Sequence, residues 1–211
     1  QTNINPLIRL RSIAGSDLLW IHSDNQYNTF IGLNSGRVNN IGSGAVANTF
    51  IGSSAGYSNT TGHSNTSLGY GAIYANNTGF ENTAIGRQAF ATNTIGTENT
   101  AIGFKAGFYN ISASRNIAIG NYALYGQAYD PGFVWNSDNV AVGHSALYFN
   151  QPTSTSNGIY NTAIGNFSLY HNNTGYYNTA AGYNALYNNT TGFKNTAMGS
   201  AALFSNTFGL Y

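Results

Sequence analysis

The sequence predicts an all-β protein, a β-solenoid of ten short coils. A pentapeptide close to Asn-Thr-Ala-Ile-Gly occurs ten times, its usual spacing is 17 residues, and Gly, Asn, Thr and Ser dominate the rest of each unit. Seventeen residues are too few for a helical hairpin repeat, which needs more than about thirty, but they suit one solenoid coil of two or three short strands. The dominant residue types also disfavour helix interiors.

The first 27 residues do not fit this repeat. Residues 4–10 and 13–21 are expected to form short strands joined by a turn at Gly15-Ser16-Asp17. Because the open end of a solenoid needs covering, residues 1–27 are predicted to be an N-terminal cap or a crossover segment. The ten-coil array then occupies residues 28–211.

The first half of each coil is expected to be a strand closed by a turn. Counting from the first Asn of the unit, position 1 is Asn and position 5 is Gly in all ten copies, position 2 is β-branched and position 4 is aliphatic in nearly all. The Gly column predicts a backbone with positive φ or a close approach. We expect position 4 to fill the lumen, so that Ile119→Asn would unfold a coil by burying an unpaired amide.

The second half of each coil predicts a further strand and corner. Position 8 is Ala or Ser, position 9 is usually Leu, Ile or Phe from the third copy on, and position 10 is aromatic in eight of ten copies. Position 12 is Asn in nine copies and Gln127 in the other. Equivalent positions should stack about 4.8 Å apart, so the two Asn columns should form amide ladders, each hydrogen bond contributing about 1 kcal/mol.

The apolar pattern also predicts self-association. Thr-Ala-Ile and Ala-Leu-Tyr are largely apolar on both sides, as in strands buried on both faces. The interior of a slender coil can bury only one face of each strand, so a single chain would expose apolar stripes along the rod. A threefold arrangement suits the small residues at positions 3 and 8, although the periodicity is compatible with two chains or three.

These motifs resemble a known group of proteins. Asn-Thr-Ala-Ile-Gly, followed by Ala-Leu-Tyr and Asn-Thr-Thr-Gly, is similar to the head repeats of trimeric autotransporter adhesins of the YadA type, whose unit reads Asn-Ser-Val-Ala-Ile-Gly. It resembles still more the tail-fibre-like repeat proteins that often end in an endosialidase-type chaperone. The resemblance covers residues 28–211, although the 17-residue period, the aromatic column and the inserts depart from the adhesin pattern. It implies a left-handed parallel β-roll, an intertwined homotrimer, and an extracellular location at a cell surface or phage fibre tip.

Two neighbouring corners are enlarged, at residues 128–138 and 151–160. Inserts on one corner of adjacent coils project side by side, and solenoid inserts tend to lie on a binding face. One interpretation is a surface that stacks on sugar or envelope components and hydrogen-bonds to them, formed by Tyr129, Asp130, Phe133, Trp135, Asn136 and Tyr160. The other is that Trp135 and Phe133 fold back to cover the rod or clasp the next chain. On the first interpretation, a five-residue corner in place of residues 128–138 keeps the trimer and abolishes attachment.

Catalysis, metals, cofactors, nucleic acid and membrane insertion are not expected. Only 6% of residues are charged, the net charge is +1, cysteine is absent, and no apolar run approaches the ~20 residues that span a bilayer. Glu81 and Glu98 should stack like a glycosidase pair, but Arg115 and Asp138 continue that column, which favours a charge ladder. The four histidines fall outside any metal-ligand spacing.

Three classes of function therefore compete. The chain is expected to be an attachment segment of an extracellular fibre that recognises a cell-surface glycan or envelope component, and the paired inserts favour this class. A passive stalk is the alternative. An ice-binding solenoid is the remote one, because Thr fills position 2 in eight copies whereas position 4 is mostly aliphatic.

Overall fold

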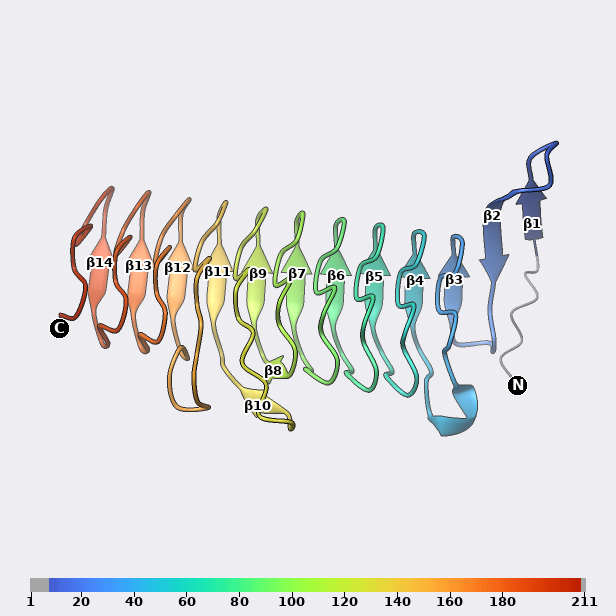
Figure 1. The fold of residues 1–211 in the computed structure, drawn as a ribbon, viewed down its shortest axis with the longest axis horizontal. Helices are drawn as coiled ribbons and strands as arrows, with labels where there is room; N and C mark the ends of the chain where they lie inside the picture. The colour runs from blue at the N-terminus through green and yellow to red at the C-terminus, as the bar shows by residue number, and fades with distance from the viewer. Residues whose placement is uncertain (1–7, 210–211) are drawn as a thin grey trace.

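The structure, a computed structural model, describes residues 8–209 and is a β-solenoid of about ten turns. Its coils stack along one axis (Figure 1). Each coil contributes one three-residue strand to a 12-stranded sheet, and successive strands pair in parallel with equivalent positions in register. These strands are β3 (Thr29–Ile31), β4 (Thr49–Ile51), β5 (Thr66–Leu68), β6 (Thr83–Ile85), β7 (Thr100–Ile102), β9 (Ile117–Ile119), β11 (Val140–Val142), β12 (Thr162–Ile164), β13 (Thr179–Ala181) and β14 (Thr196–Met198). The all-β class and the 17-residue coil are confirmed.

An N-terminal hairpin extends this sheet. Strands β1 (Ile8–Arg11) and β2 (Asp17–His22) pair antiparallel, and β2 pairs antiparallel with β3. The carboxylate of Asp17 accepts hydrogen bonds from Arg9 and Arg11, which lowers its pKa to about 2. His22 lies against Phe30 with ring centroids 5.1 Å apart, at the end of the lumen. Residues 4–7 of the first predicted strand lie outside the described residues.

The prediction of a second strand at positions 8–10 is wrong. Positions 6–11 form a chain of turns, and φ is positive at every other residue from position 5 to position 9, as at Gly86 (φ 129°), Gln88 (58°) and Phe90 (47°). The amides of this segment bond to both neighbouring coils, with Gln88 N donating to the Tyr70 carbonyl and Phe90 N to the Ala106 carbonyl, each at 2.9 Å. Contacts between coils therefore hold a backbone that bulky residues rarely adopt alone.

The corners supply the remaining short elements. The first coil carries a single 3-10 turn, η1 (Ile41–Ser43), which Asn40 caps through its side chain. At the enlarged corner of the sixth coil, β10 (Trp135–Asn136) pairs in parallel with β8 (Ala113–Ser114) of the coil before it.

Position 3, and not position 4, faces the lumen. Ala118 at position 3 is fully buried, whereas Ile119 at position 4 is 37% exposed. Side chains alternate along a strand, so an inward position 3 places positions 2 and 4 outside. The expected unfolding by Ile119→Asn is therefore wrong, because that amide would meet solvent. The small residues of positions 3 and 8 line the interior of their own coil and not an axis shared between chains.

Positions 3 and 9 fill the lumen with complementary sizes. Coils with Phe30 or Phe50 at position 3 have Gly36 or Gly56 at position 9. Most later coils reverse this pattern, pairing Ala, or Ser in the third coil, at position 3 with a buried Leu, Ile or Phe at position 9. A Cβ added at Gly56 would lie 2.4 Å from the Phe50 ring, so each large residue occupies the space that its partner leaves.

Both requirements predicted for the Gly column are confirmed. Gly86 has a φ of 129°, and a Cβ there would lie 2.5 Å from the Gly103 carbonyl oxygen of the next coil. Backbones of successive coils thus touch at this corner, where only glycine fits.

The two Asn columns form the predicted ladders inside the coil. At position 1, Asn99 Nδ2 donates to Asn82 Oδ1, and its own Oδ1 accepts from the backbone and side-chain nitrogens of Asn116, at 3.0 to 3.1 Å. At position 12, Asn93 Nδ2 donates to Asn76 Oδ1 at 3.0 Å. Both columns also donate to the corner carbonyl at position 15, so one buried network ties strand, turns and corner together.

Candidate ligand-binding site

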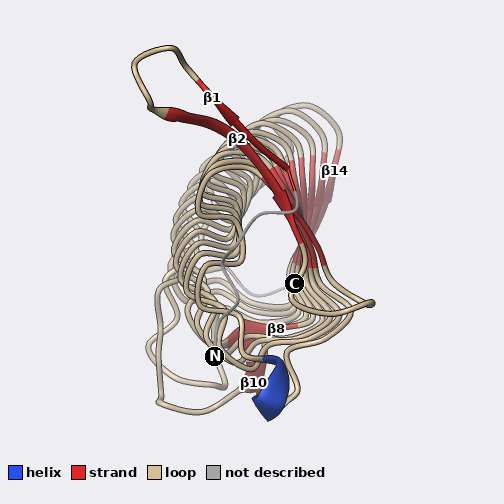
Figure 2. Ribbon diagram, turned by 90° about the vertical axis from the view of Figure 1, so that its right-hand side faces the viewer, coloured by secondary structure: helices blue, strands red, loops and turns tan. Residues whose placement is uncertain are grey.

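The strands and the turns occupy different sides of the coil, as Figure 2 shows along the stack. The outer face of the sheet carries a Thr row at position 2 and an aliphatic row at position 4. All ten side chains of the aliphatic row are at least partly exposed, up to 76% at Met198. The two rows required of an ice-binding face are thus both outward, but only one of them is Thr.

The turn side carries a column of stacked rings at position 10, which we call the aromatic ladder. Neighbouring rings lie nearly parallel, with centroids 4.9 Å apart for Tyr57 and Tyr74 and 5.1 Å apart for Tyr170 and Tyr187. The ladder comprises Tyr57, Tyr74, Phe108, Tyr125, Tyr148, Tyr170, Tyr187 and Phe204. Because Ala, Leu and Asn fill the lumen, these rings lie outside the core.

Close packing of the phenols perturbs their ionisation. Burial, a hydrogen bond with Tyr109 and the neighbouring phenols raise the pKa of Tyr125 to about 12. The pKa values of Tyr148 and Tyr170 are also raised, chiefly by burial.

We expect the aromatic ladder to lose stability at high pH. A raised pKa in the folded state means that folding favours the protonated phenol, so this stabilisation is complete below pH 10 and is lost as the pH rises toward 12. The melting temperature of the wild type should fall over that range. The melting temperature of Tyr125→Phe should fall less steeply, because the phenylalanine ring cannot ionise at this position. Parallel slopes in the two proteins would contradict a contribution from Tyr125.

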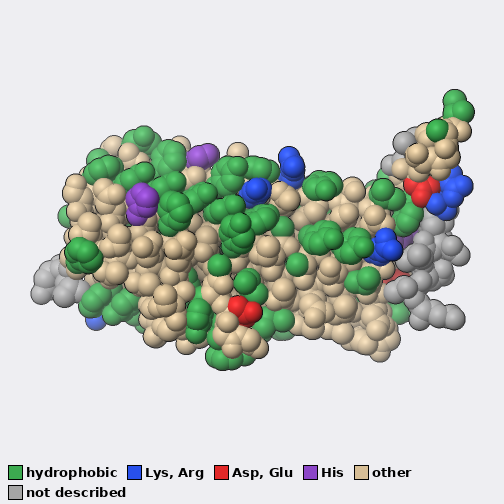
Figure 3. Space-filling view, in the orientation of Figure 1, with side chains coloured by type: hydrophobic (Ala, Val, Ile, Leu, Met, Phe, Trp, Pro, Cys, Tyr) green, Lys and Arg blue, Asp and Glu red, His purple; other side chains and the backbone are tan. Residues whose placement is uncertain are grey.

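Three cations lie beside aromatic rings on the turn side of the coils, namely Arg37, Arg87 and Lys105. The Arg37 guanidinium is 5.6 Å from the Tyr57 ring centroid, and Lys105 Nζ is 5.0 Å from that of Phe108. Arg87 lies 5.8 Å from the Tyr70 centroid and 5.7 Å from that of Phe104. Within residues 8–209, no acidic side chain forms an ion pair with any of the three. Figure 3 shows Lys and Arg among hydrophobic side chains on this side, and the cations lie near the first part of the ladder, from Tyr57 to Phe108.

The candidate residues of the two inserts differ in exposure and in what they contact. Trp135 is 5% exposed and packs with Ala113 and Ile159, and Tyr129 meets it edge to face. Tyr160 stacks on Tyr177 at 4.9 Å in the corner column. The other three, Asp130, Phe133 and Asn136, are exposed on the insert, Phe133 by 58%. Trp135 therefore covers the rod, as the second interpretation expects, while Phe133 does not fold back.

The first insert connects the two ladders at a point where the position-12 ladder is interrupted, because the buried Oδ1 atom of Asn110 has no hydrogen-bond partner from Gln127. Gln127 Nε2 donates to Ser137 Oγ at 2.7 Å, and Ser137 Oγ donates to Asn116 Oδ1 at 2.7 Å. The Gln127 Oε1 atom then accepts from Asn139 and Asn150. The one Gln in the column thus occurs where an insert supplies a hydroxyl to bridge the two ladders.

This bridge changes the expected result of the corner replacement. Exchanging residues 128–138 for a five-residue Asn-Thr-Thr-Gly corner removes Ser137 and Trp135, leaving buried polar groups unpaired at roughly 1–3 kcal/mol each. We expect a lower melting temperature, and partial recovery when Gln127→Asn is added, because Asn is the residue that fits a short corner elsewhere. An unchanged melting temperature in the exchange alone would contradict the bridging role.

Of the charge ladder predicted for position 17, the described residues show one ion pair, in which Arg115 donates to Asp138 at 2.6 Å. This hydrogen bond, together with the charges of Asp138 and Glu98, raises the pKa of the guanidinium. Among the described residues, no group of three or more His, Asp or Glu side chains is placed to hold a metal ion. No helix in residues 8–209 is long and apolar enough to cross a bilayer.

Comparison with known proteins identifies no relative of this chain. No protein-family model matches the chain, and searches among curated proteins and solved structures find no match. The aromatic ladder is the strongest site candidate. In the sequence this ladder is visible as the aromatic column at position 10. The apolar pattern by itself led us to expect that column at contacts between chains.

Proposed function

We propose that this chain is a structural and attachment segment of an extracellular fibre, of the kind found in trimeric adhesins and tail fibres, which recognises a cell-surface glycan or envelope component. The observation that carries the proposal is the aromatic ladder outside the lumen. The Ala, Leu and Asn columns already fill the coil, so the rings are not needed there. Tyrosine offers large contact area at low ordering cost, and such rings dominate recognition surfaces. A passive stalk would not need them.

The proposed fibre is a homotrimer joined through the outer face of the sheet. The aliphatic row at position 4 runs the length of the array, with exposures of 47% at Leu68 and 48% at Ile164. A continuous apolar stripe of this kind exceeds what a soluble monomer usually exposes, so a second chain is its simplest cover. The resemblance to trimeric adhesins supports three chains and a left-handed coil.

Light scattering tests the assembly. The wild-type segment should have a mass near three times 22.4 kDa. Ile102→Lys with Ile119→Lys should reduce the mass toward one chain without loss of β structure, because both side chains lie on the outer face. A wild-type mass near 22.4 kDa would reject the trimer.

Attachment is tested by capture of the intact segment on whole bacterial or host cells and on a glycan array. Tyr125→Ala with Tyr148→Ala should weaken capture, while the lysine pair above serves as a control for assembly. A wild-type segment that binds no cell and no glycan would support the passive stalk instead.

A further inference from the structure

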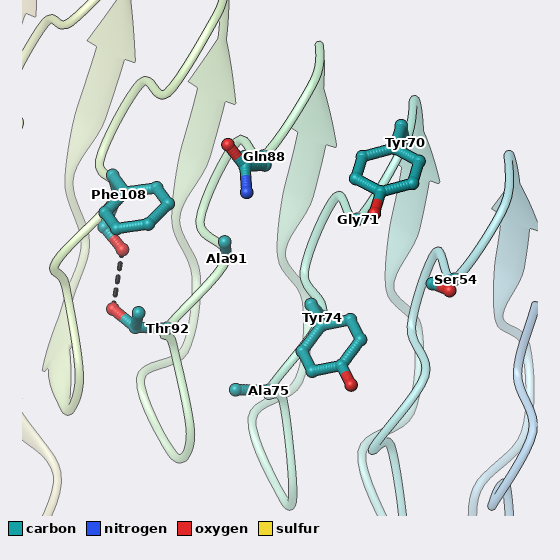
Figure 4. A pocket seen from close by; sticks show the side chains of 9 residues that line it. All are labelled: Ser54, Tyr70, Gly71, Tyr74, Ala75, Gln88, Ala91, Thr92 and Phe108. Atoms are coloured by element: carbon teal, nitrogen blue, oxygen red, sulfur yellow. Dashed lines mark hydrogen bonds between the residues drawn. The ribbon is translucent and has the colours of Figure 1, made fainter.

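The aromatic ladder has one missing rung. Tyr74 stacks on Tyr57 and Phe108 stacks on Tyr125, but the coil between them carries Ala91 at position 10. Figure 4 shows Ala91 between the two rings. Tyr74 and Phe108 therefore each lack a stacking partner on the side that faces the gap.

The gap is a pocket of about 390 Å³, which we call the slot. Its floor is made of small residues, Gly71, Ala75 and Ala91, and its walls include Tyr74 and Phe108. Polar side chains complete the lining, namely Ser54, Tyr70, Gln88 and Thr92. The Thr92 hydroxyl already donates to the Phe108 carbonyl at 2.5 Å, and Ser54 lies on the other side of Tyr74 from Ala91 (Figure 4), so Tyr70 and Gln88 supply the free hydrogen-bonding groups beside the gap.

The width of the slot suits one ring. Coils are spaced about 4.8 Å apart, so walls two coils apart leave about 9.6 Å, enough for a flat group at stacking distance from both. The neighbouring position-6 column provides an internal precedent. There the planar guanidinium of Arg87 lies between Tyr70 and Phe104, 5.8 and 5.7 Å from their centroids. At position 10 the chain supplies no such group.

Charge and polarity select the occupant. A cationic group would be drawn to the rings but repelled by Arg87 and Lys105, and Lys105 lies only 5.0 Å from the Phe108 wall. A purely apolar group would leave the polar lining unpaired. A sugar ring presents C–H groups to the walls and hydroxyls to Tyr70 and Gln88. A carboxylate on it would be attracted by Arg87 and Lys105, whose charges lie beside the lining rings of Tyr70 and Phe108.

We propose that the slot binds one pyranose ring of an acidic glycan, with its carboxylate directed toward Arg87 and Lys105. This inference rests on the proposed attachment function and names its ligand class. The ring stacks between Tyr74 and Phe108 and completes the aromatic ladder. Ligand selection is then governed by the slot, and the stacked rings beside it, from Tyr125 onward, supply further contact surface.

The decisive variant is Ala91→Tyr, which supplies the missing rung from the chain itself. The probes are tetrasaccharides of galacturonic acid and of glucuronic acid, titrated by calorimetry at low salt, with maltotetraose as the neutral probe. Wild type should bind at least one acidic probe, and Ala91→Tyr should bind it at least tenfold more weakly while melting at a higher temperature. Ser205→Tyr, which adds a ring at an exposed site away from the slot, should bind like wild type.

A second variant tests the charge. Arg87→Gln should lower the affinity for the acidic probe several-fold and leave the affinity for maltotetraose unchanged. Equal affinity of wild type and Ala91→Tyr, or no binding of either acidic probe by wild type, would overturn the proposal. Cell capture distinguishes failure of the slot proposal from failure of the attachment function. If cells capture Ala91→Tyr as well as wild type, the slot proposal is rejected and the attachment function stands. If cells do not capture the wild type, the attachment function itself is rejected.

Discussion

Gly56→Leu should unfold the second coil, and Phe50→Ala in the same chain should restore it. The new side chain would begin 2.4 Å from the Phe50 ring, in a lumen that is already filled. Overpacking of a core typically costs about 1–3 kcal/mol and rises when no relaxation is open to the backbone. Here the ring stacks on Phe30 at 5.3 Å, which restricts its movement, so we expect a cost at or above the upper end of that range.

The double variant has a natural template in the same molecule. It combines Ala at position 3 with Leu at position 9, as Ala118 and Leu124 do. The backbone also matches, because φ is 58° at Gly56 and 50° at Leu124. Phe50→Ala alone leaves a cavity worth roughly 3–5 kcal/mol, so the double variant should be more stable than either single one. Chemical denaturation of the four proteins measures this, and additive losses would show that positions 3 and 9 do not share one space.

The columns with specific backbone or hydrogen-bonding roles were predictable from sequence, because each role admits one residue type. The Gly column requires a missing side chain, as Gly86 shows against Gly103, and the Asn columns require a donor and an acceptor at a fixed reach. The Gly column and the Asn column at position 1 repeat without substitution, and their repetition sets the coil length and the register of the parallel sheet.

The assignment of inside and outside was wrong because the strand is apolar on both sides. In Thr-Ala-Ile the largest side chain is at position 4, and its size suggested that position 4 lies in the core. In the structure the lumen instead contains the Ala of position 3 and, from the opposite wall, the Leu of position 9. A signal was present, since Phe30 and Phe50 occur only where position 9 is Gly. That exchange of volume identifies positions 3 and 9 as neighbours.

Other features depend on contacts that no local pattern reports. The left-handed backbone at Phe90 and Leu124 is unfavourable for these residues in isolation, and bonds to adjacent coils maintain it. The burial of Trp135 depends on the pairing of β10 with β8, which joins segments 22 residues apart. The slot at Ala91 is visible in the sequence only after position 10 is known to lie outside the lumen.

Asn99→Ala should be among the most destabilising single substitutions in the chain. Asn99 is buried, its Oδ1 accepts from both nitrogens of Asn116, and its Nδ2 donates to Asn82 Oδ1 and to the Ala113 carbonyl. Removing it leaves two or three buried polar groups unpaired at about 1–3 kcal/mol each, a loss of roughly 3–6 kcal/mol. Stability is measured by the denaturation midpoint.

The matched control for this loss is Asn121→Ala, because Asn121 makes the same kind of bond in an exposed place. Its Oδ1 accepts from Phe104 N at 2.9 Å, close to the 3.0 Å between Asn99 Oδ1 and Asn116 N. Water can replace the amide oxygen at the exposed site, so Asn121→Ala should cost under about 1 kcal/mol. If the two substitutions cost the same, the ladders contribute no more than surface hydrogen bonds, and the stability of the rod must come from the lumen packing that Gly56→Leu tests.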